Sequence, residues 1–318
     1  MDWLDTKLFQ ELFQSQDASP LPSDFRASFR SMARRLGVEE ATLRNRIKSF
    51  QQSGVLNGWR VFVNPTLLGY GVAEIWLDVS PPSSKREMIR KIRLIQGVSD
   101  VVSHVGSSLT SILLYPGENS LRKQTELAAR ITNCENVVVA RIPFPSCMIK
   151  LAPMDWRIIR SLKDNPRKQY SLLSEQLGLS NKTVKRRIRR LIDGKAVFFL
   201  PSLDPTALRG VIIADLLVFY ETPGSKHRVD TAIRSRLQKH LLRAEIGDKD
   251  HGFYNLAISN VAMAEEIQSW VGELPGVSNV RVDLVQERFE SSDIMDDLLQ
   301  NRETGAPETE RSGIVFGR

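Results

Sequence analysis

Apolar residues recur with a helical period in three consecutive segments of the second half of the chain. Between Met154 and Lys163 they return every three or four positions, and Asn165-Pro166 ends this helix because proline disfavours helical geometry in the residue before it. A second, short helix is predicted from Leu172 to Leu177, where Gly178 closes it. A third helix follows Ser180, whose hydroxyl can cap the first backbone N–H groups. This succession is typical of a helix-turn-helix.

The third helix separates apolar from basic positions. Val184, Ile188 and Leu191 share one face, whereas the segment 180–195 carries seven Lys and Arg against one acid, with six of the cations inside nine residues. A helix of this kind suits the major groove of DNA, and the alternative is a solvated basic helix without a partner. We expect the groove contacts to come from Lys182, Lys185, Arg186 and Arg189, and phosphate contacts from Thr183 and Arg190. Arg187 lies nearer the packed edge.

An internal repeat relates the two halves. The segment Leu36 to Leu56 aligns without a gap on Leu177 to Val197, at an offset of 141 residues. The match extends downstream, where Asn64-Pro65 mirrors Asp204-Pro205. The first half differs by the insertion Gln14 to Pro22, whose polar, proline-containing composition predicts a longer loop. Each half is therefore one complete unit.

The first copy of the motif has a weaker basic face. Its candidate DNA contacts are Arg44, Asn45 and Lys48, but Glu39 and Glu40 open the helix, where acids repel phosphate even though they suit the helix dipole. We expect this copy either to bind DNA more weakly than the second or to serve a structural role.

After each motif the pattern changes to β-α-β-β-α-β. In the first half we predict strands 72–79, 98–105, 109–115 and 136–143 with helices 85–95 and 121–131; in the second half, strands 211–220, 241–246, 253–259 and 277–288 with helices 226–238 and 262–272. This order is the ferredoxin-like arrangement, with two helices on one face of a four-stranded antiparallel sheet. The other face of each sheet also needs to be covered. We expect apolar residues there, namely Ile75, Leu77, Leu217 and Phe219, and these favour pairing between the two sheets.

The predicted fold class is α+β, with two winged helix-turn-helix domains and two ferredoxin-like domains in tandem. The domain boundaries we expect are 1–66, 67–148, 149–206 and 207–290, followed by an acidic, flexible tail at 291–318. The length of 318 residues agrees with several separate cores, and the net charge of +7 is compatible with a polyanionic partner.

Composition excludes several other classes of protein. Cys134 and Cys147 are the two cysteines, and neither lies in a CxxC pair or a metal-ligand spacing, so we expect free thiols and neither a metal nor a cofactor. No apolar run is long enough to cross a bilayer, and the first ten residues lack the basic start of a signal peptide. A cytoplasmic protein without a membrane partner is the expectation.

These motifs resemble the leucine-responsive regulatory protein family, Lrp/AsnC, over nearly the whole chain. The resemblance is carried by LAPMDWRII at 151–159, LGLSNKTVKRRIRRL at 177–191 and the sheet pattern after Val211. It implies a DNA-binding transcriptional regulator whose α+β domains are RAM-like. Family members usually carry one such unit per chain and dimerise, so a tandem chain implies an internal pseudo-dimer or a homodimer with four reading units.

The resemblance also implies a site for an amino-acid-like effector. The turn EIGDKDHGF at 245–253 is similar to the effector loop of family members, where Gly247, Asp248 and Asp250 would bind the ligand. An ordinary polar hairpin turn explains the same residues. The four histidines share no spacing with metal partners, and we expect them to be solvated or hydrogen-bonded.

Two other functions remain open from the sequence. Fused Lrp-like halves also occur in sirohaem decarboxylases, which act on a tetrapyrrole, but the chain shows no matching cluster of His and Arg and we expect no catalytic residues. An architectural protein that coats DNA would carry the same basic charge as a specific regulator. We expect a regulator that binds double-stranded DNA, and not an enzyme.

Overall fold

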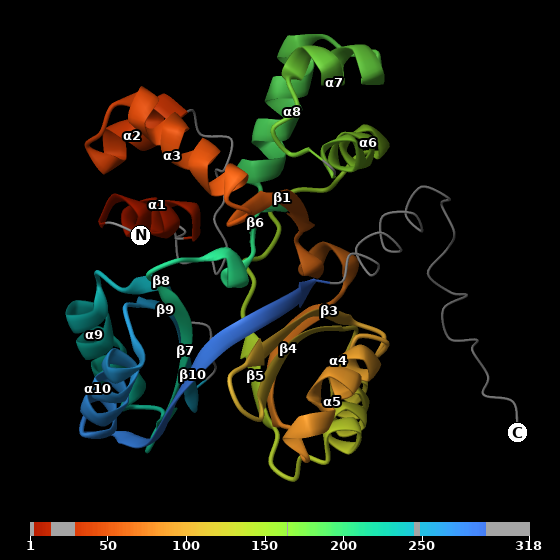
Figure 1. Ribbon diagram of the computed structural model, residues 1–318. Helices are drawn as coiled ribbons and strands as arrows, with labels where there is room; N and C mark the ends of the chain where they lie inside the picture. The colour runs from red at the N-terminus through yellow and green to blue at the C-terminus, as the bar shows by residue number, and fades with distance from the viewer. Residues whose placement is uncertain (1–2, 14–28, 164, 245–248, 291–318) are drawn as a thin grey trace, which may run out of the picture.

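The computed structural model describes residues 3–13, 29–163, 165–244 and 249–290. It consists of two helix-turn-helix units above a layer of antiparallel sheet that is covered by helices on its outer sides (Figure 1). The predicted insertion at 14–22 and the predicted acidic tail at 291–318 lie outside the described residues. The α+β fold class is confirmed.

Both halves follow the same order of α-helices and strands. The first comprises α1 (Trp3–Phe13), α2 (Phe29–Leu36), α3 (Glu40–Gln52), β1 (Leu56–Val63), η1 (Pro65–Leu68), β2 (Gly71–Asp78), η2 (Pro82–Ser84), α4 (Lys85–Ile92), β3 (Val98–His104), β4 (Ser108–Tyr115), α5 (Glu118–Thr132) and β5 (Val138–Ile142). The second comprises α6 (Pro153–Leu162), α7 (Tyr170–Leu177), α8 (Asn181–Asp193), β6 (Val197–Leu203), η3 (Pro205–Ala207), β7 (Ile212–Tyr220), α9 (Lys226–Leu237), β8 (Leu241–Ala244), β9 (His251–Ile258), α10 (Val261–Gly272) and β10 (Val277–Glu290). The predicted tandem arrangement is thereby confirmed.

Each helix-turn-helix unit contains an equivalent ion pair between its first and third helices. In the first, Arg46 of α3 lies 3.2 Å from Asp5 of α1; in the second, Arg187 of α8 lies 2.8 Å from Asp155 of α6. Each pair fixes the third helix against the first. Gly178 ends α7 with a φ of 66°, the left-handed conformation that glycine adopts without strain.

The strands that follow the two units pair with each other in a two-stranded ribbon. β1 and β6 run antiparallel, with Val63 opposite Val197 and Trp59 opposite Pro201. The strand β6 continues through Pro201. Because each strand of such a ribbon has one edge without a partner, the N–H that proline lacks is not required there.

The ferredoxin-like halves merge into one eight-stranded sheet in the order β5-β2-β4-β3-β10-β7-β9-β8. The junction is β10, a strand of 14 residues that crosses between the halves in Figure 1. Its residues 277–284 pair with β7, and its residues 285–290 pair with β3 of the first half. The shared strand makes the two domains one continuous body.

The faces of the two halves that lack helices pack against each other, as the sequence predicted. Trp76 of β2 is 2% exposed and lies 5.4 Å from Phe253 of β9, and Leu217 belongs to the same buried cluster. The residues chosen for this face in the first half were wrong. Ile75 and Leu77 pack in the core beneath α4 and α5, because successive residues of a strand point to opposite faces.

The first helix-turn-helix is docked on the second sheet. The side-chain amide of Gln10 in α1 donates to the carbonyl oxygens of Gln238 (2.8 Å) and Leu241 (2.9 Å), at the edge where β8 begins. The corresponding edge of the first sheet, β3, is already paired with β10. The second helix-turn-helix instead packs on Val63 and Leu68 from the first half. The two helix-turn-helix units are therefore held differently.

Candidate nucleic-acid interface

The helix α8 is positioned by its cap and its apolar face. Ser180 accepts a hydrogen bond from the backbone N–H of Thr183 at 3.2 Å, as the sequence predicted for an N-cap. Val184, Ile188 and Leu191 are at most 1% exposed and form the core with α6 and α7. This packing fixes which residues of α8 face away from the protein.

The outward face of α8 presents cations to solvent. Lys182, Lys185 and Arg186 are exposed and make no ion pair among the described residues. Arg189 is exposed as well and lies 3.8 Å from Asp193, beyond hydrogen-bonding distance. The helix belongs to the unit at the top of Figure 1, away from the sheets. These four residues form the outward basic face of α8, available to an anionic partner.

Two other basic residues of α8 are held by α6. Arg190 donates to the carboxylate of Asp155 at 3.1 Å and to the carbonyl oxygen of Lys150 at 2.8 Å, and Arg187 contacts the same carboxylate. Asp155 is fully buried, so these bonds stabilise the unit. Arg190, which we expected at a phosphate, therefore has a structural partner. Thr183 is half-buried, with its hydroxyl 2.9 Å from that of Ser180.

The corresponding helix of the first unit, α3, presents less free charge. Arg44 donates to Glu40 at 2.9 Å and lies 4.6 Å above the ring of Phe29. Asn45 and Lys48 are exposed. An arginine already paired with a carboxylate on its own helix contributes little attraction for phosphate, because the pair is locally neutral.

Of the predicted effector residues, Gly247 and Asp248 lie outside the described residues. Asp250 is exposed, and its backbone carbonyl accepts a hydrogen bond from the N–H of Tyr220 at 3.1 Å. The effector loop stays a prediction.

A buried cluster of charges that the sequence analysis missed lies where β3 meets β10. Asp100, 2% exposed, accepts hydrogen bonds from Arg288 (2.7 and 3.1 Å), from Arg60 (3.3 Å) and from the hydroxyl of Ser99 (2.9 Å). Burial by itself raises the pKa of Asp100, but the guanidinium groups of Arg288 and Arg60 outweigh it and hold that pKa below its usual range. We call Asp100, Arg60 and Arg288 the seam cluster.

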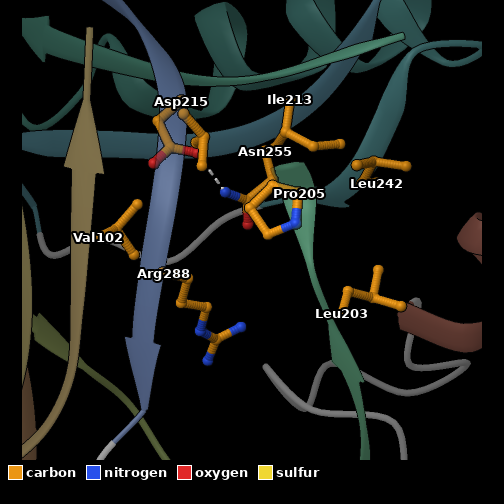
Figure 2. Close-up of a pocket in the computed structure, with 9 residues that line it drawn as sticks. Val102, Leu203, Pro205, Ile213, Asp215, Leu242, Asn255 and Arg288 are labelled. Atoms are coloured by element: carbon orange, nitrogen blue, oxygen red, sulfur yellow. Dashed lines mark hydrogen bonds between the residues drawn. The ribbon is translucent and has the colours of Figure 1, made fainter. Parts of the chain in front are cut away.

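A second buried polar group lies near the seam cluster. His104, fully buried, is 2.8 Å from Asp215, and the amide of Asn255 donates to the other oxygen of that carboxylate at 2.6 Å. His104 thus has a hydrogen-bonded partner, as expected for a buried histidine. Beside these residues is a cavity of about 110 Å³, which we call the inter-sheet cavity (Figure 2). Its lining residues are Val102, Leu203, Pro205, Ile213, Asp215, Leu242, Asn255, Val285 and Arg288.

Strand patterning contained a partial signal for both groups. Asp100 and Asp215 interrupt apolar strands, and a carboxylate at such a position needs a buried partner. The sequence could not show which partner, since His104 and Asp215 are 111 residues apart.

The described residues contain no group of three or more His, Cys, Asp or Glu side chains placed to hold a metal ion. Cys134 and Cys147 are free and half-buried. Within the same described ranges, no helix is long and apolar enough to span a membrane.

Comparison with known proteins finds a family model that matches the second helix-turn-helix unit. Residues 151–194 match the family model described as "Winged helix-turn-helix DNA-binding". The chain is 34% identical over 107 residues to the uncharacterized HTH-type transcriptional regulator PF1231 of Pyrococcus furiosus. The aligned region covers 33% of this chain and 70% of PF1231. It is 25% identical over 95 residues to the HTH-type transcriptional regulator LrpA of Pyrococcus horikoshii, covering 30% of this chain and 67% of LrpA.

Across the curated relatives that it matches, the chain spans between 57% and 70% of their lengths. Among solved structures, the sirohaem decarboxylase NirDL superposes over 95% of this chain and 100% of its own, with a TM-score of 0.54 and 16% identity, a likeness that shows the fold alone. The match to most of PF1231, the resemblance to LrpA and the repeated α+β architecture agree. The chain belongs to the Lrp/AsnC family of helix-turn-helix proteins, in a form that carries the family's unit twice.

Proposed function

We propose that the protein is a DNA-binding transcriptional regulator that reads double-stranded DNA mainly through α8. The observation that carries the proposal is the outward basic face of α8, composed of Lys182, Lys185, Arg186 and Arg189. These side chains project from a helix whose opposite face is buried, within the segment that matches a winged DNA-binding family. Two of its turns would lie along the major groove, with the capped N-terminus toward the bases.

Substitutions on α8 test the assignment. The double variant Lys185→Gln/Arg186→Gln removes two of the four cations without touching the core or Asp155. The matched control Arg122→Gln/Lys123→Gln removes two exposed cations from α5 on the sheet domain. We expect the α8 variant to lower DNA affinity and to reduce the slope of log K against log salt by about 0.9 for each phosphate that it no longer neutralises. Equal behaviour of the two variants would contradict the proposal.

The first unit has a smaller part in this proposal. Because Arg44 is paired with Glu40, α3 offers Lys48 and Asn45 to DNA, whereas α8 offers four cations. Lys48→Gln should weaken binding less than Lys185→Gln when both are titrated on the same duplex. A larger loss with Lys48→Gln would make α3 the principal reading helix.

A tetrapyrrole enzyme is the second candidate, favoured by the fold likeness to NirDL over 95% of the chain. The inter-sheet cavity of about 110 Å³ is too small for such a substrate, because sites for drug-sized ligands already measure roughly 300–1,000 Å³. The large side chains of Trp76 and Phe253 also fill the space between the sheets. We therefore propose a role in regulation and not catalysis. Absorbance titration with sirohaem tests this, and a saturable shift of the sirohaem spectrum would revive the enzyme.

We further propose that the two halves of one chain pair with each other as two separate single-unit chains would, so that one chain is an internal pseudo-dimer. Support comes from β10, which pairs with β3 of the other half, and from the ribbon of β1 and β6. Light scattering at micromolar concentration should report the mass of one chain. A dimer would mean that four reading units act together.

A further inference from the structure

We propose that Arg167 is a positioning residue that holds the two helix-turn-helix units at one relative placement. It lies in the turn between α6 and α7 of the second unit, and its guanidinium carbon lies 4.1 Å from the ring centre of Phe29, in α2 of the first unit. The same carbon lies 5.7 Å from the ring centre of Trp59 in β1. We call Arg167, Phe29 and Trp59 the inter-unit contact. None of the α8 residues proposed for DNA contacts belongs to it.

The ring of Phe29 attracts cations from both units. Arg44 of α3 lies 4.6 Å from its centre, and Arg167 of the second unit lies nearer. A guanidinium within about 6 Å of an aromatic ring is attracted by the negative face of the ring, and the attraction grows where water is excluded. Phe29 and Arg167 are both half-buried. Because Glu40 pairs with Arg44, the charge of Arg44 does little to repel Arg167.

The turn that carries Arg167 is fixed by its own sequence. The side-chain oxygen of Asn165 accepts the backbone N–H of Arg167 at 3.1 Å, and its carbonyl oxygen accepts that of Lys168 at 3.0 Å. Pro166 between them is buried, and its ring holds φ near the value that such a turn needs. The backbone of Arg167 is therefore ordered by local bonds, and the entropy cost of the contact with Phe29 is confined to the side chain.

Trp59 forms the second point of contact, at the base of the two units. It packs against the core of the first unit and against that of the second, and it lies in the ribbon of β1 and β6, opposite Pro201. In Figure 1 the third helix of each unit leads into this ribbon. The ribbon alone would let one unit rock against the other, because two strands without a further layer are only marginally stable. Contacts at two separate points, Trp59 and Phe29, remove that motion.

A single placement of the two units would restrict which DNA sites the chain accepts. Two helix-turn-helix units on one face of a duplex read half-sites about 34–36 Å apart, roughly 10–10.5 base pairs. Each added base pair moves the second half-site by about 3.4 Å and turns it by about 35° around the axis. Rigid units cannot follow both changes, so Arg167 would set the spacing that the chain selects. This consequence rests on the proposed function, whereas the placement itself does not.

Pulsed electron paramagnetic resonance on the full chain without DNA tests the placement. Nitroxide labels at Ser49→Cys in α3 and Glu175→Cys in α7 report the distance between the units, because both positions are exposed. Cys134 and Cys147 are first replaced by serine, so that only the two introduced positions are labelled. We expect one narrow distance in this parent chain and a distribution at least about twice as wide with Arg167→Gln, since small interfaces otherwise permit relative motion of domains.

Matched variants separate the contact from a general loss of charge. Arg157→Gln removes an exposed arginine of α6 that has no ring contact within the described part of the chain, and it should leave the distribution narrow. Phe29→Leu keeps an apolar side chain but loses the ring face and should widen the distribution as Arg167→Gln does, whereas Phe29→Tyr should keep it narrow. The double variant Arg167→Gln/Phe29→Leu should be no wider than either single variant, because both remove the same contact. A broad distribution in the parent chain, or an unchanged one with Arg167→Gln, overturns the proposal.

Selection from a pool of duplexes with about 40 random base pairs tests the consequence for DNA, since this length spans more than three helical turns. The unsubstituted chain and Arg157→Gln should enrich pairs of half-sites at one spacing, and Arg167→Gln should enrich the same half-sites at several spacings. The same single spacing with Arg167→Gln would overturn the role of this residue in site selection. If the distances between the labels behave as expected but no sequence is enriched, the proposed function fails and the positioning by Arg167 stands.

Discussion

Replacing Asp100 by asparagine should destabilise the junction between the two halves. The carboxylate is 2% exposed and forms ion pairs with both Arg288 and Arg60. The asparagine oxygen can still accept a hydrogen bond, but the two guanidinium groups lose their nearest counter-charge and keep the longer contacts to the carboxylate of Glu290, at 3.6 Å from Arg60 and 3.8 Å from Arg288. Breaking a buried ion pair by removing one partner costs about 3–5 kcal/mol, and we expect the lower end of that range in the free energy of unfolding from urea titration.

The effect should depend on pH in a defined direction. The pKa of Asp100 is lower in the folded protein than in the unfolded chain, where it is about 3.9. Its contribution to stability is therefore fully present above the unfolded pKa and is lost as the pH falls through the folded pKa. The difference in unfolding free energy between the original chain and Asp100→Asn should be constant from pH 6 to 7 and shrink below about pH 4.

Asp78→Asn is the matched control. Its carboxylate also binds an arginine, Arg281, at 2.7 and 3.0 Å, but the side chain of Asp78 is 51% exposed. Exposed ion pairs contribute about 0–1 kcal/mol, so this variant should change stability little. If Asp100→Asn were as mild as Asp78→Asn, or if its effect did not change with pH, the seam cluster would not hold the halves together as described.

Two further changes probe how the parts are joined. Gln10→Ala removes the side-chain amide that donates to the carbonyls of Gln238 and Leu241 where α1 packs on β8. Loss of these two hydrogen bonds should cost about 1–3 kcal/mol and speed amide hydrogen exchange in α1, and unchanged exchange would mean that α1 is not fixed by this contact. Trp76→Ala empties the space between the sheets and should cost about 3–5 kcal/mol in urea unfolding, whereas Leu94→Ala, at a side chain 84% exposed, should stay within about 0.5 kcal/mol. Similar losses for these two variants would contradict the proposed packing of the sheets.

The local features of the fold were predictable because they depend on neighbouring residues. The cap at Ser180, the helix end at Gly178 and the apolar face of α8 follow from spacing within one or two turns. The strand order within each half also follows from the alternation of short strands and helices. The ion pair between Arg187 and Asp155 of α6 was also partly indicated, because the sequence placed Arg187 near the packed edge of its helix.

Long-range pairing was not predictable from these patterns. Nothing in the composition of residues 277–290 shows that one strand serves both sheets, since pairing with β3 joins positions nearly two hundred residues apart. The same limit hid the partners of Asp100 and Asp215. The side chain of Arg190 bonds Asp155 and is not part of the outward basic face of α8. This depends on side-chain packing, which residue spacing alone does not predict.

The most direct test of the central claim is retention of genomic fragments by the purified chain at physiological salt, with non-specific competitor DNA and sequencing of what is bound. The account predicts a small set of fragments that share a motif, and loss of that enrichment with Lys185→Gln/Arg186→Gln. Uniform retention would show an architectural protein without sequence preference. No retention would contradict the assignment of α8 as a DNA-reading helix.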